Sequence, residues 1–436
     1  MAIETLRTAT FEQGVPYHCS TVIDALFPPT VELLPQTNQL YELDLAWGEF
    51  KSLSEEELVK RGAYFKAVHG CPTHHYEICL ATPNQVNPTA AKARKHFFEA
   101  NMFAVGYATH GLFPYRGKFH PQMVKALMNI IGLKPGDTVL DPMVGCGTVC
   151  IEASIMGINS IGIEPNPFAC LMSRAKLAVL DMDTSRFEQL RVHADEIAGE
   201  LDPRIKPQLR MMAEANVKEQ LEDDRLRQLL LLCYLDAMGY ARRRKNKTAR
   251  ALFPELLERY LAAVKAFNEV RRSLRLKLAR GRIIEGDARD MTQWIASESV
   301  DGIVFSPPYS FAIDYLDNDR LQLEFMGVDV EGLKERMVGL RVDRGAEGAL
   351  VERKVSTYFQ DMDRVLGECS RVLKPGRCCV VVVGSNTNQT GGIFLEDTLV
   401  ELARRQGMLL FKDTVREIEG IRNTMRDEHL LFFMKL

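Results

Sequence analysis

The sequence predicts a doubly wound α/β fold built on a mostly parallel sheet. Short apolar runs that are typical of buried strands occur at residues 138–140, 160–164, 301–305 and 378–384. The segment 358–376, just before the last of these runs, places its apolar residues at helical spacing on one face. Strands that alternate with helices in this way form parallel sheets. Ligands of such sheets bind at the carboxyl ends of the strands.

Three further segments complete the expected sheet. The run RIIEGDA (282–288) is expected to form a strand that ends in its aspartate. The runs MLLFKDTVREI (408–418) and HLLFFMKL (429–436) are expected to form a strand pair at the end of the sheet. Pro375 and Gly376 are expected to end the preceding helix, because proline cannot continue a helix and glycine commonly follows one.

The composition is that of a globular chain without an excess of positive charge. The 436 residues are enough for two or three domains, and 46% of them are hydrophobic. A net charge of −3 means that binding to nucleic acid would need a local basic patch. The ten cysteines are scattered, and the amino terminus lacks the apolar run of a signal peptide or membrane span. We therefore expect a reduced, cytoplasmic protein with no membrane contact.

The motif TVLDPMVGCGT at 138–148 has the pattern of a ligand-binding turn between a strand and a helix. Its glycines permit backbone conformations that other residues rarely adopt, and they let a ligand approach closely. A dinucleotide-binding turn would need a third glycine at position 150, where the chain has Cys150, so NAD and FAD are disfavoured. The residues of this motif expected to contact a ligand are Asp141, Pro142, Gly145, Gly147 and Thr148.

Acidic residues stand at the ends of the next two strands along the chain. Glu164 ends the run SIGIE, and its carboxylate suits the two hydroxyls of a ribose. Asp287 ends the next strand, where it is placed to accept a hydrogen bond from an adenine amino group. Either acid alone is more often a solvated turn residue. Together with Asp141, in this order along the chain, they indicate a cofactor that contains adenosine.

The four residues Ser306-Pro307-Pro308-Tyr309 follow the apolar strand at 301–305. The two prolines lack backbone donors, which leaves the carbonyls before and between them to face a ligand. The Ser306 hydroxyl can both accept and donate hydrogen bonds, and Tyr309 offers a flat face for stacking. Such a set suits a planar ring that carries an amine, although Ser-Pro-Pro can also simply end a strand.

The chemistry that needs this set is methylation of an exocyclic amine on a nucleobase. The lone pair of such an amine is delocalised into the ring, so the nitrogen is a poor nucleophile. Acceptors aimed at its two N–H groups localise the lone pair, and this stabilisation grows in the transition state. A base inside a duplex would have to flip out to reach the site. Methylation at carbon 5 is disfavoured, because the enzymes that perform it use a Pro-Cys pair and the chain contains none.

The motifs taken together carry a family resemblance. DPMVGCGT, IEPNP, EGDA and SPPY are similar to the S-adenosylmethionine-dependent amino-methyltransferases of DNA. The Ser-Pro-Pro-Tyr form looks most like the cytosine-N4 branch, whereas the adenine-N6 branch usually carries Asp-Pro-Pro-Tyr. The resemblance covers roughly residues 112–180 and 281–436. It implies a Rossmann-like class I methyltransferase sheet with a terminal antiparallel strand pair, S-adenosyl-L-methionine as the cofactor, and DNA as the partner.

The same resemblance implies roles for further residues. GKFHP (117–121) is similar to the family's cofactor-binding segment before the glycine loop, which implies that Phe119 lines the cofactor. Ala288 of the EGDA motif is implied as another cofactor contact. The cytosine N4 amine is expected to hydrogen-bond to Ser306 and to the carbonyl of Pro307, with no covalent enzyme intermediate.

A second resemblance leaves the substrate open. DPMVGCGTVCIEA, with FHP before it, is also similar to tRNA and rRNA guanine-N2 methyltransferases, which usually have Asp or Asn at the position of Ser306. The alternatives are therefore a guanine-N2 methyltransferase of RNA, an adenine-N6 methyltransferase of DNA, and a catalytically silent nucleic-acid-binding module. The intact acidic residues and the unbroken SPPY argue against a silent module, and Ser306 favours DNA over RNA.

Two regions lie outside the implied methyltransferase core of 106–180 and 281–436. Residues 1–105 form an N-terminal region, and residues 181–280 are a helical insertion rich in Leu, Glu and Arg. The insertion contains ARRRKNKTAR (241–250), the densest basic run of the chain. Such a run is often a solvated helix face, but it also suits phosphate contacts, which position a duplex without reading its sequence. Either region is a candidate for target recognition.

The N-terminal region also brings four metal-ligating residue types close together in the run HGCPTHHYEIC. They are Cys71, His74, His75 and Cys79. Zinc sites use such residues, but this spacing is not one of the usual paired Cys-x-x-Cys forms. We therefore predict no metal site, and we favour surface or core packing for these residues over the metal alternative.

Overall fold

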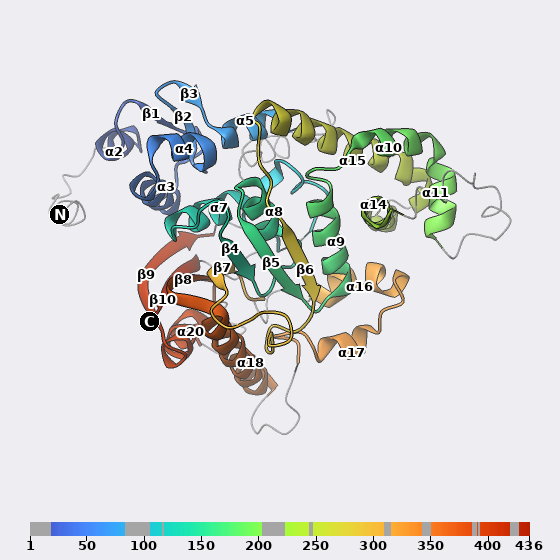
Figure 1. The fold of residues 1–436 in the computed structure, drawn as a ribbon. Coiled ribbons are helices and arrows are strands. Elements are labelled where there is room, and N and C mark those ends of the chain that lie inside the picture. Colours follow the sequence, from blue (N-terminus) through green and yellow to red (C-terminus); the bar gives the residue numbers. More distant parts are fainter. Residues whose placement is uncertain are drawn as a thin grey trace, which may run out of the picture.

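A seven-stranded sheet forms the centre of the structure, with helices on both of its faces (Figure 1). The computed structural model describes residues 19–82, 105–115, 117–202, 223–243, 247–308, 315–341, 350–385, 390, 393–418 and 427–436. The strands of the central sheet are β4 (Thr138–Asp141), β5 (Asn159–Glu164), β6 (Gly281–Glu285), β7 (Val300–Phe305), β8 (Leu373–Val383), β9 (Met408–Glu417) and β10 (Asp427–Lys435).

The strand order, β6-β5-β4-β7-β8-β10-β9, is that of a doubly wound fold. The strands from β6 to β8 are parallel, and β10 is antiparallel to both of its neighbours, β8 and β9. The chain winds outward from β4 through β5 to β6, then returns to β7 and continues in the other direction. The carboxyl ends of β4 and β7 therefore flank the point where the winding reverses, which is where ligands bind in such sheets. The predicted fold class is confirmed, including the terminal antiparallel pair.

Side chains of the strands alternate between two hydrophobic cores, one on each face of the sheet. Val139 of β4 and Phe432 of β10 belong to one core, and their neighbours Leu140 and Phe433 belong to the other. Adjacent residues of a strand point to opposite faces, so both faces of the sheet are buried. The helices around the sheet are α7 (Pro121–Ile130), α8 (Thr148–Ile155), α9 (Pro167–Ala178), α16 (Tyr315–Phe325), α17 (Val330–Lys334), α18 (Leu350–Val372) and α20 (Leu395–Arg405).

The N-terminal region forms a small three-stranded sheet with helices, and it shares a core with the central sheet. Buried Leu45, Leu58 and Tyr64 belong to the same hydrophobic core as Val139 and Val380 of the central strands. The region is therefore packed onto the face of the sheet that α7 covers. Its elements are α2 (Cys19–Leu26), β1 (Val31–Leu33), α3 (Leu40–Ser52), α4 (Glu55–Arg61), β2 (Phe65–Val68), β3 (Cys71–Pro72) and α5 (His74–Ala81).

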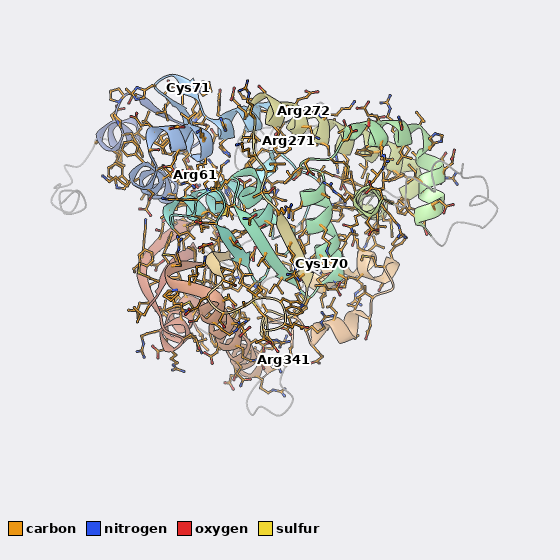
Figure 2. All side chains as sticks on the ribbon, viewed as in Figure 1. Arg61, Cys71, Cys170, Arg271, Arg272 and Arg341 are labelled. Carbon is orange, nitrogen blue, oxygen red and sulfur yellow. The ribbon has the colours of Figure 1, made fainter. Side chains whose placement is uncertain are left out.

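Buried polar contacts fix the N-terminal region to α7. The carboxylate of Glu49 in α3 accepts hydrogen bonds from the backbone N–H of Ala63 at 3.0 Å and from Asn129 Nδ2 of α7 at 2.6 Å. Asn129 Nδ2 also donates to the Arg61 carbonyl at 2.8 Å. The Arg61 guanidinium lies between α4 and α7, where it donates to the Leu133 carbonyl (Figure 2). Burial raises the pKa of Glu49 to about 7, so its charged form depends on these donors.

The insertion between β5 and β6 is helical in its described part, and it lies beside α9 (Figure 1). Leu229, Phe253 and Tyr260 of the insertion form a core together with Phe168 of α9. Its elements are α10 (Thr184–Leu190), the 3₁₀ turn η2 (Arg191–His193), α11 (Ala194–Leu201), α14 (Asp224–Arg243) and α15 (Ala249–Ser273). The basic run ends α14 and begins α15, and its residues 244–246 lie outside the described part. None of the described helices is long and apolar enough to cross a membrane.

Two predicted boundaries differ from the structure. The helix expected to end at Pro375-Gly376 ends at Val372, and β8 begins at Leu373. Leu373 already pairs with Val300 of β7, and the register shifts before Cys378, so the Pro-Gly pair sits in a bulge of the strand. Sheet pairing at Leu373 thus overrides the local helix signal. The strand expected to reach Asp287 ends at Glu285, and Asp287 lies in the loop beyond it.

Replacing Asn129 by alanine should destabilise the whole fold. The change removes the amide donor of the buried Glu49 carboxylate and leaves the Arg61 carbonyl unpaired. We expect the free energy of unfolding, measured by urea denaturation with tryptophan fluorescence, to fall by about 2–3 kcal/mol. Asn159→Ala is the matched control, because its amide donates to the Gly136 carbonyl at the surface. Equal stabilities of the two variants would contradict the proposed role of the Glu49 contacts.

Candidate active site at the carboxyl ends of the strands

Two adjoining cavities open at the carboxyl ends of the central strands. The larger has a volume of about 740 Å³ and the smaller one of about 100 Å³. The residues that line both are Gly117, Met143, Gly145, Ser306 and Tyr315. A Cβ atom on Gly117, whose φ is +76°, would lie 2.8 Å from Cε1 of Tyr315. Glycine at this position therefore lets the tyrosine ring pack at the boundary of the two cavities.

The structure gathers the residues predicted from the sequence around these cavities. Every predicted site residue that the structure describes lines one of them, except Gly147. Those on the larger cavity are Phe119, Asp141, Gly145, Thr148, Ser306 and Pro307. Those on the smaller cavity are Pro142, Gly145, Glu164, Asp287, Ala288, Ser306 and Pro308. Tyr309 lies outside the described residues, so its stacking role stays a prediction from the sequence.

The glycine loop makes a tight turn into α8. Gly147 has φ +89° and caps the amino terminus of this helix. A Cβ atom there would lie 3.0 Å from Oγ of Ser173 in α9, a tight contact that would force Ser173 to shift. The same Ser173 Oγ donates to the Gly145 carbonyl at 2.7 Å. Gly147 thus acts by allowing α9 to pack against the loop, while Gly145 exposes its backbone to the cavities.

Glu164, at the end of β5, connects two loops through its carboxylate. Its Oε2 accepts from the backbone N–H of Gly145 and its Oε1 from that of Asn166, both at 3.0 Å. Burial raises the pKa of Glu164 to about 7, against the lowering effect of these two hydrogen bonds. A carboxylate whose ionised form is only partly stabilised by the protein suits a ligand that brings further donors.

Asp141, at the end of β4, lies in a similar environment. Its Oδ1 accepts from the backbone N–H of Met143 at 3.0 Å. Burial, together with the negative charge of the neighbouring Glu164, raises the pKa of Asp141 to about 8. On the same cavity, the Thr148 hydroxyl donates to the Phe119 carbonyl at 3.4 Å, which connects the segment before α7 to the start of α8.

Asp287 has a partner that the sequence did not indicate. Its carboxylate accepts from the backbone N–H of Arg289 at 2.9 Å and from Nη2 of the same residue at 2.6 Å. Partial burial acts to raise the pKa of Asp287, but these hydrogen bonds and the charge of Arg289 hold that pKa below its usual value. The Nε of Arg289 also donates to both oxygens, at 3.0 and 3.1 Å. A carboxylate offers about four lone-pair positions, so little room remains for a further donor.

A further buried acid, which no sequence motif indicated, contacts Asn166 of the smaller cavity. Asp319 of α16 accepts from Asn166 Nδ2 at 3.0 Å. Burial raises the pKa of Asp319 to about 7. Asn166 also caps α9, because its Oδ1 accepts from the backbone N–H of Phe168 at 2.9 Å. The signal for Asn166 was present in the sequence, since an asparagine before Pro167 is typical of a helix start. No comparable signal marked Asp319.

Helix α3 and the terminal strand pair supply residues to the larger cavity that no motif indicated. Tyr41 and Glu42 of α3, Arg416 of β9 and Glu428 of β10 line the larger cavity together with Ser306. These elements come together only through the tertiary fold. Local sequence patterns therefore carry no signal for this part of the cavity.

The cysteines and histidines of the N-terminal region lie in different environments. Cys71 is exposed at the outer edge of the structure, whereas His75 and Cys79 are buried (Figure 2). The His75 Nε2 atom lies 3.7 Å from the Cys79 sulfur, and the His75 ring packs edge-on against Tyr107. Among the residues described here, no group of three or more His, Cys, Asp or Glu side chains is arranged to hold a metal ion.

The buried carboxyls should make the stability of the cofactor-free protein depend on pH. Because burial raises the pKa of Asp141 in the folded state, its contribution is full at low pH and is lost as the pH rises to about 8. We expect the free energy of unfolding to fall between pH 5 and pH 8, by on the order of 1 kcal/mol per pH unit for this group. In Asp141→Asn the decline should be shallower.

Chemical denaturation at pH 5, 6, 7 and 8 measures this dependence. Asp137→Asn is the matched control, because Asp137 lies in the turn before β4 and its carboxylate accepts only from the backbone N–H of Lys134 among the described residues. The control should keep the wild-type slope. Parallel curves for wild type and Asp141→Asn would show that Asp141 is ionised in the fold at neutral pH, contrary to the expectation.

Comparison with known proteins adds to this geometry. The family described as “RMKL-like, methyltransferase domain” matches residues 112–222. The type II methyltransferase M.BsoBI of Geobacillus stearothermophilus is 22% identical over 334 residues, which are 62% of this chain and 66% of that protein. The type II methyltransferase M.MjaII of Methanocaldococcus jannaschii is 44% identical over 73 residues, 17% of this chain and 14% of that protein.

One shorter alignment and one solved structure complete the comparison. A tRNA (guanine(10)-N2)-dimethyltransferase of Methanothermobacter thermautotrophicus is 38% identical over 52 residues, 12% of this chain and 16% of that protein. In each of these three alignments the chain covers less than two thirds of its relative. The crystal structure of TrmN from Thermus thermophilus matches 74% of this chain and 50% of its own, with 14% identity and a TM-score of 0.31. The chain thus resembles the DNA amino-methyltransferases and, more weakly, the tRNA guanine-N2 methyltransferases, a class whose cofactor is S-adenosyl-L-methionine.

Proposed function

We propose that this chain is an S-adenosylmethionine-dependent methyltransferase that acts on the exocyclic amine of a nucleobase, and that its substrate is cytosine N4 in DNA. The observation that carries the proposal is the position of Ser306, which lines both cavities. Glu164 and Asp287 line the smaller cavity, and Asp141 lines the larger one. A residue at this boundary can contact a substrate amine beside the reactive end of a cofactor. The strand order and the motif order support the same reaction class.

The residues around the smaller cavity fit S-adenosyl-L-methionine. Glu164 would accept from the ribose hydroxyls, and Asp287 and Ala288 would lie along the adenine. The exposed backbone of Gly145 would lie beside the cofactor, and Phe119 would line it from the larger cavity. Bound in this way, the cofactor supplies an electrophilic methyl group. The fit rests on Gly145, which lines both cavities without a side chain, and on the buried Glu164, whose ionised form the protein alone only partly stabilises.

The protein's own contribution to the chemistry would be to hold and polarise the amine. The Ser306 hydroxyl and the Pro307 carbonyl would accept from the two N–H groups of the base, since neither proline has a backbone donor of its own. These hydrogen bonds strengthen as the nitrogen becomes pyramidal, so they favour the transition state over the ground state. The base would flip out of its duplex to enter the larger cavity, and Tyr309 would stack on it.

DNA is favoured over RNA by two observations. Ser306 stands where the guanine-N2 enzymes usually have Asp or Asn, and the longest of the alignments above is to a type II methyltransferase. A type II relative also favours a role in restriction–modification. The RNA alternative, a guanine-N2 methyltransferase, is supported by the 52-residue match to a tRNA dimethyltransferase. Adenine-N6 methylation in DNA is the third candidate, and a silent binding module is disfavoured by the intact motifs.

Labelled methyl transfer tests the proposed substrate directly. The full chain would be incubated with methyl-labelled S-adenosyl-L-methionine and either unmethylated duplex DNA or unmodified tRNA, followed by nucleoside mass analysis. We expect N4-methylcytosine in DNA. N2-methylguanosine in RNA would replace the proposal by the RNA alternative, and N6-methyladenine would keep the reaction but change the base. Absence of transfer to either polymer, by protein that binds the cofactor, would support the silent module.

The Ser306→Ala variant tests the proposed amine contact. Loss of one acceptor that acts in the transition state should lower kcat by about 100- to 1,000-fold. The affinity for S-adenosyl-L-methionine, measured by calorimetry, should change little, because the ribose and adenine contacts remain. Ser299→Ala is the matched control, since its hydroxyl donates to the Ala296 carbonyl at the exposed start of β7. Full activity of Ser306→Ala would remove Ser306 from the proposed site.

A further inference from the structure

The wall of the larger cavity that comes from the N-terminal region and the terminal strand pair is built around one arginine. Arg416 of β9 donates through Nη1 to Glu428 Oε2 of β10 at 2.8 Å. Its guanidinium carbon lies 5.3 Å from the ring centroid of Tyr41 in α3. All three residues line the larger cavity, as Ser306 does. A guanidinium held by an acid on one side and an aromatic ring on the other has a defined orientation.

Arg416 keeps donors that the described protein groups do not use. A guanidinium carries five N–H groups in a planar fork, and the bond to Glu428 uses one of its nitrogens. The Nε atom is buried without a hydrogen-bond partner in the described part of the chain. The side chain is 24% exposed, and the surface that it exposes lines the cavity. Because the guanidinium lines the cavity, its remaining N–H groups can donate to a ligand that presents acceptors there.

Two acids of this wall, Glu42 and Glu428, already accept hydrogen bonds. Glu42 accepts from the backbone N–H groups of Asn38 and Gln39, at 2.9 and 3.1 Å, and from the Tyr41 hydroxyl at 3.4 Å. Glu428 accepts from Arg416. The groups that Arg416 offers to the cavity are N–H donors. They match a base that presents acceptors on this side.

We propose that Arg416 is a specificity-determining residue that reads the acceptor edge of the target base, namely N3 and O2 of a cytosine. This inference rests on the proposed amine methylation at Ser306. In cytosine the N4 amine is followed along the same edge by two acceptors, ring N3 and O2. In guanine the N2 amine is followed by the N1–H donor, which would face the arginine donors unfavourably. Adenine presents one acceptor, N1, beside its N6 amine. The planar fork therefore selects cytosine over both purines.

Variants of Arg416 test this reading with the full-length chain. Arg416→Lys keeps the charge beside Glu428 but loses the planar fork, and Arg416→Met keeps much of the volume but loses the charge. On unmethylated genomic DNA, both should lower kcat/KM for cytosine methylation by about 10- to 100-fold. The affinity for S-adenosyl-L-methionine should stay within about twofold, because Arg416 does not line the smaller cavity, where the ribose and adenine would lie. Arg404→Lys is the matched control, because Arg404 pairs with Glu401 on the exposed face of α20.

A second readout separates base selection from folding. Synthetic duplexes that carry 3-deazacytosine at the methylated position lack the N3 acceptor, so the wild type should lose activity on them. Arg416→Lys should discriminate far less between cytosine and 3-deazacytosine. Equal discrimination by wild type and Arg416→Lys, with kcat/KM within about twofold on normal DNA, would overturn the inference while leaving the proposed function in place. A wild type that methylates guanine or adenine instead of cytosine would overturn both the cytosine substrate and the role of Arg416.

Discussion

The carboxylate of Glu164 holds together the strand-end loops on which the rest of the site depends. One oxygen accepts from Gly145 in the loop after β4, and the other accepts from Asn166 at the start of α9. Asn166 in turn donates to Asp319 of α16, the helix that begins with Tyr315 at the boundary of the two cavities. A single buried acid thus couples the glycine turn, the cap of α9 and the wall between the cavities. Its position between these groups follows from the parallel pairing of β4 with β5.

A separate constraint places the opposite wall of the larger cavity. Asp44 of α3 accepts from Lys412 Nζ at 3.0 Å and from the Thr414 hydroxyl at 2.7 Å, both in β9. These bonds fix α3 against the edge strand of the sheet. The hydrophobic core shared by the N-terminal region and the sheet excludes water behind them. As a result Tyr41 faces Arg416, although the two lie at opposite ends of the chain.

The parts of the site that could be predicted from the sequence are those encoded locally. Asp141 and Glu164 each end an apolar strand, and the glycines at 145 and 147 mark a turn, so their convergence follows from a parallel sheet. The engagement of Asp287 by Arg289 was not predictable, because either residue alone is an ordinary loop residue. Nor was the bulge at Pro375-Gly376, where sheet pairing outweighs a helix-ending signal. Pairing with β7 decides the bulge, and Arg289, two residues from Asp287, also donates from Nη1 to Asp361 of α18 at 2.9 Å. Local patterns do not record these contacts between elements.

This division between local and distant contacts explains why the motifs indicate the reaction better than the substrate. The cofactor side of the site is built by loops that directly follow strands, so a short stretch of similar sequence is enough to reproduce it. The far wall of the larger cavity is built by α3, β9 and β10, which no shared motif covers. The residues proposed to hold the amine and the groups proposed to face the rest of the base thus come from separate parts of the chain. Under the proposed function, the choice of base would depend on residues such as Arg416 as well as on the Ser-Pro-Pro-Tyr motif.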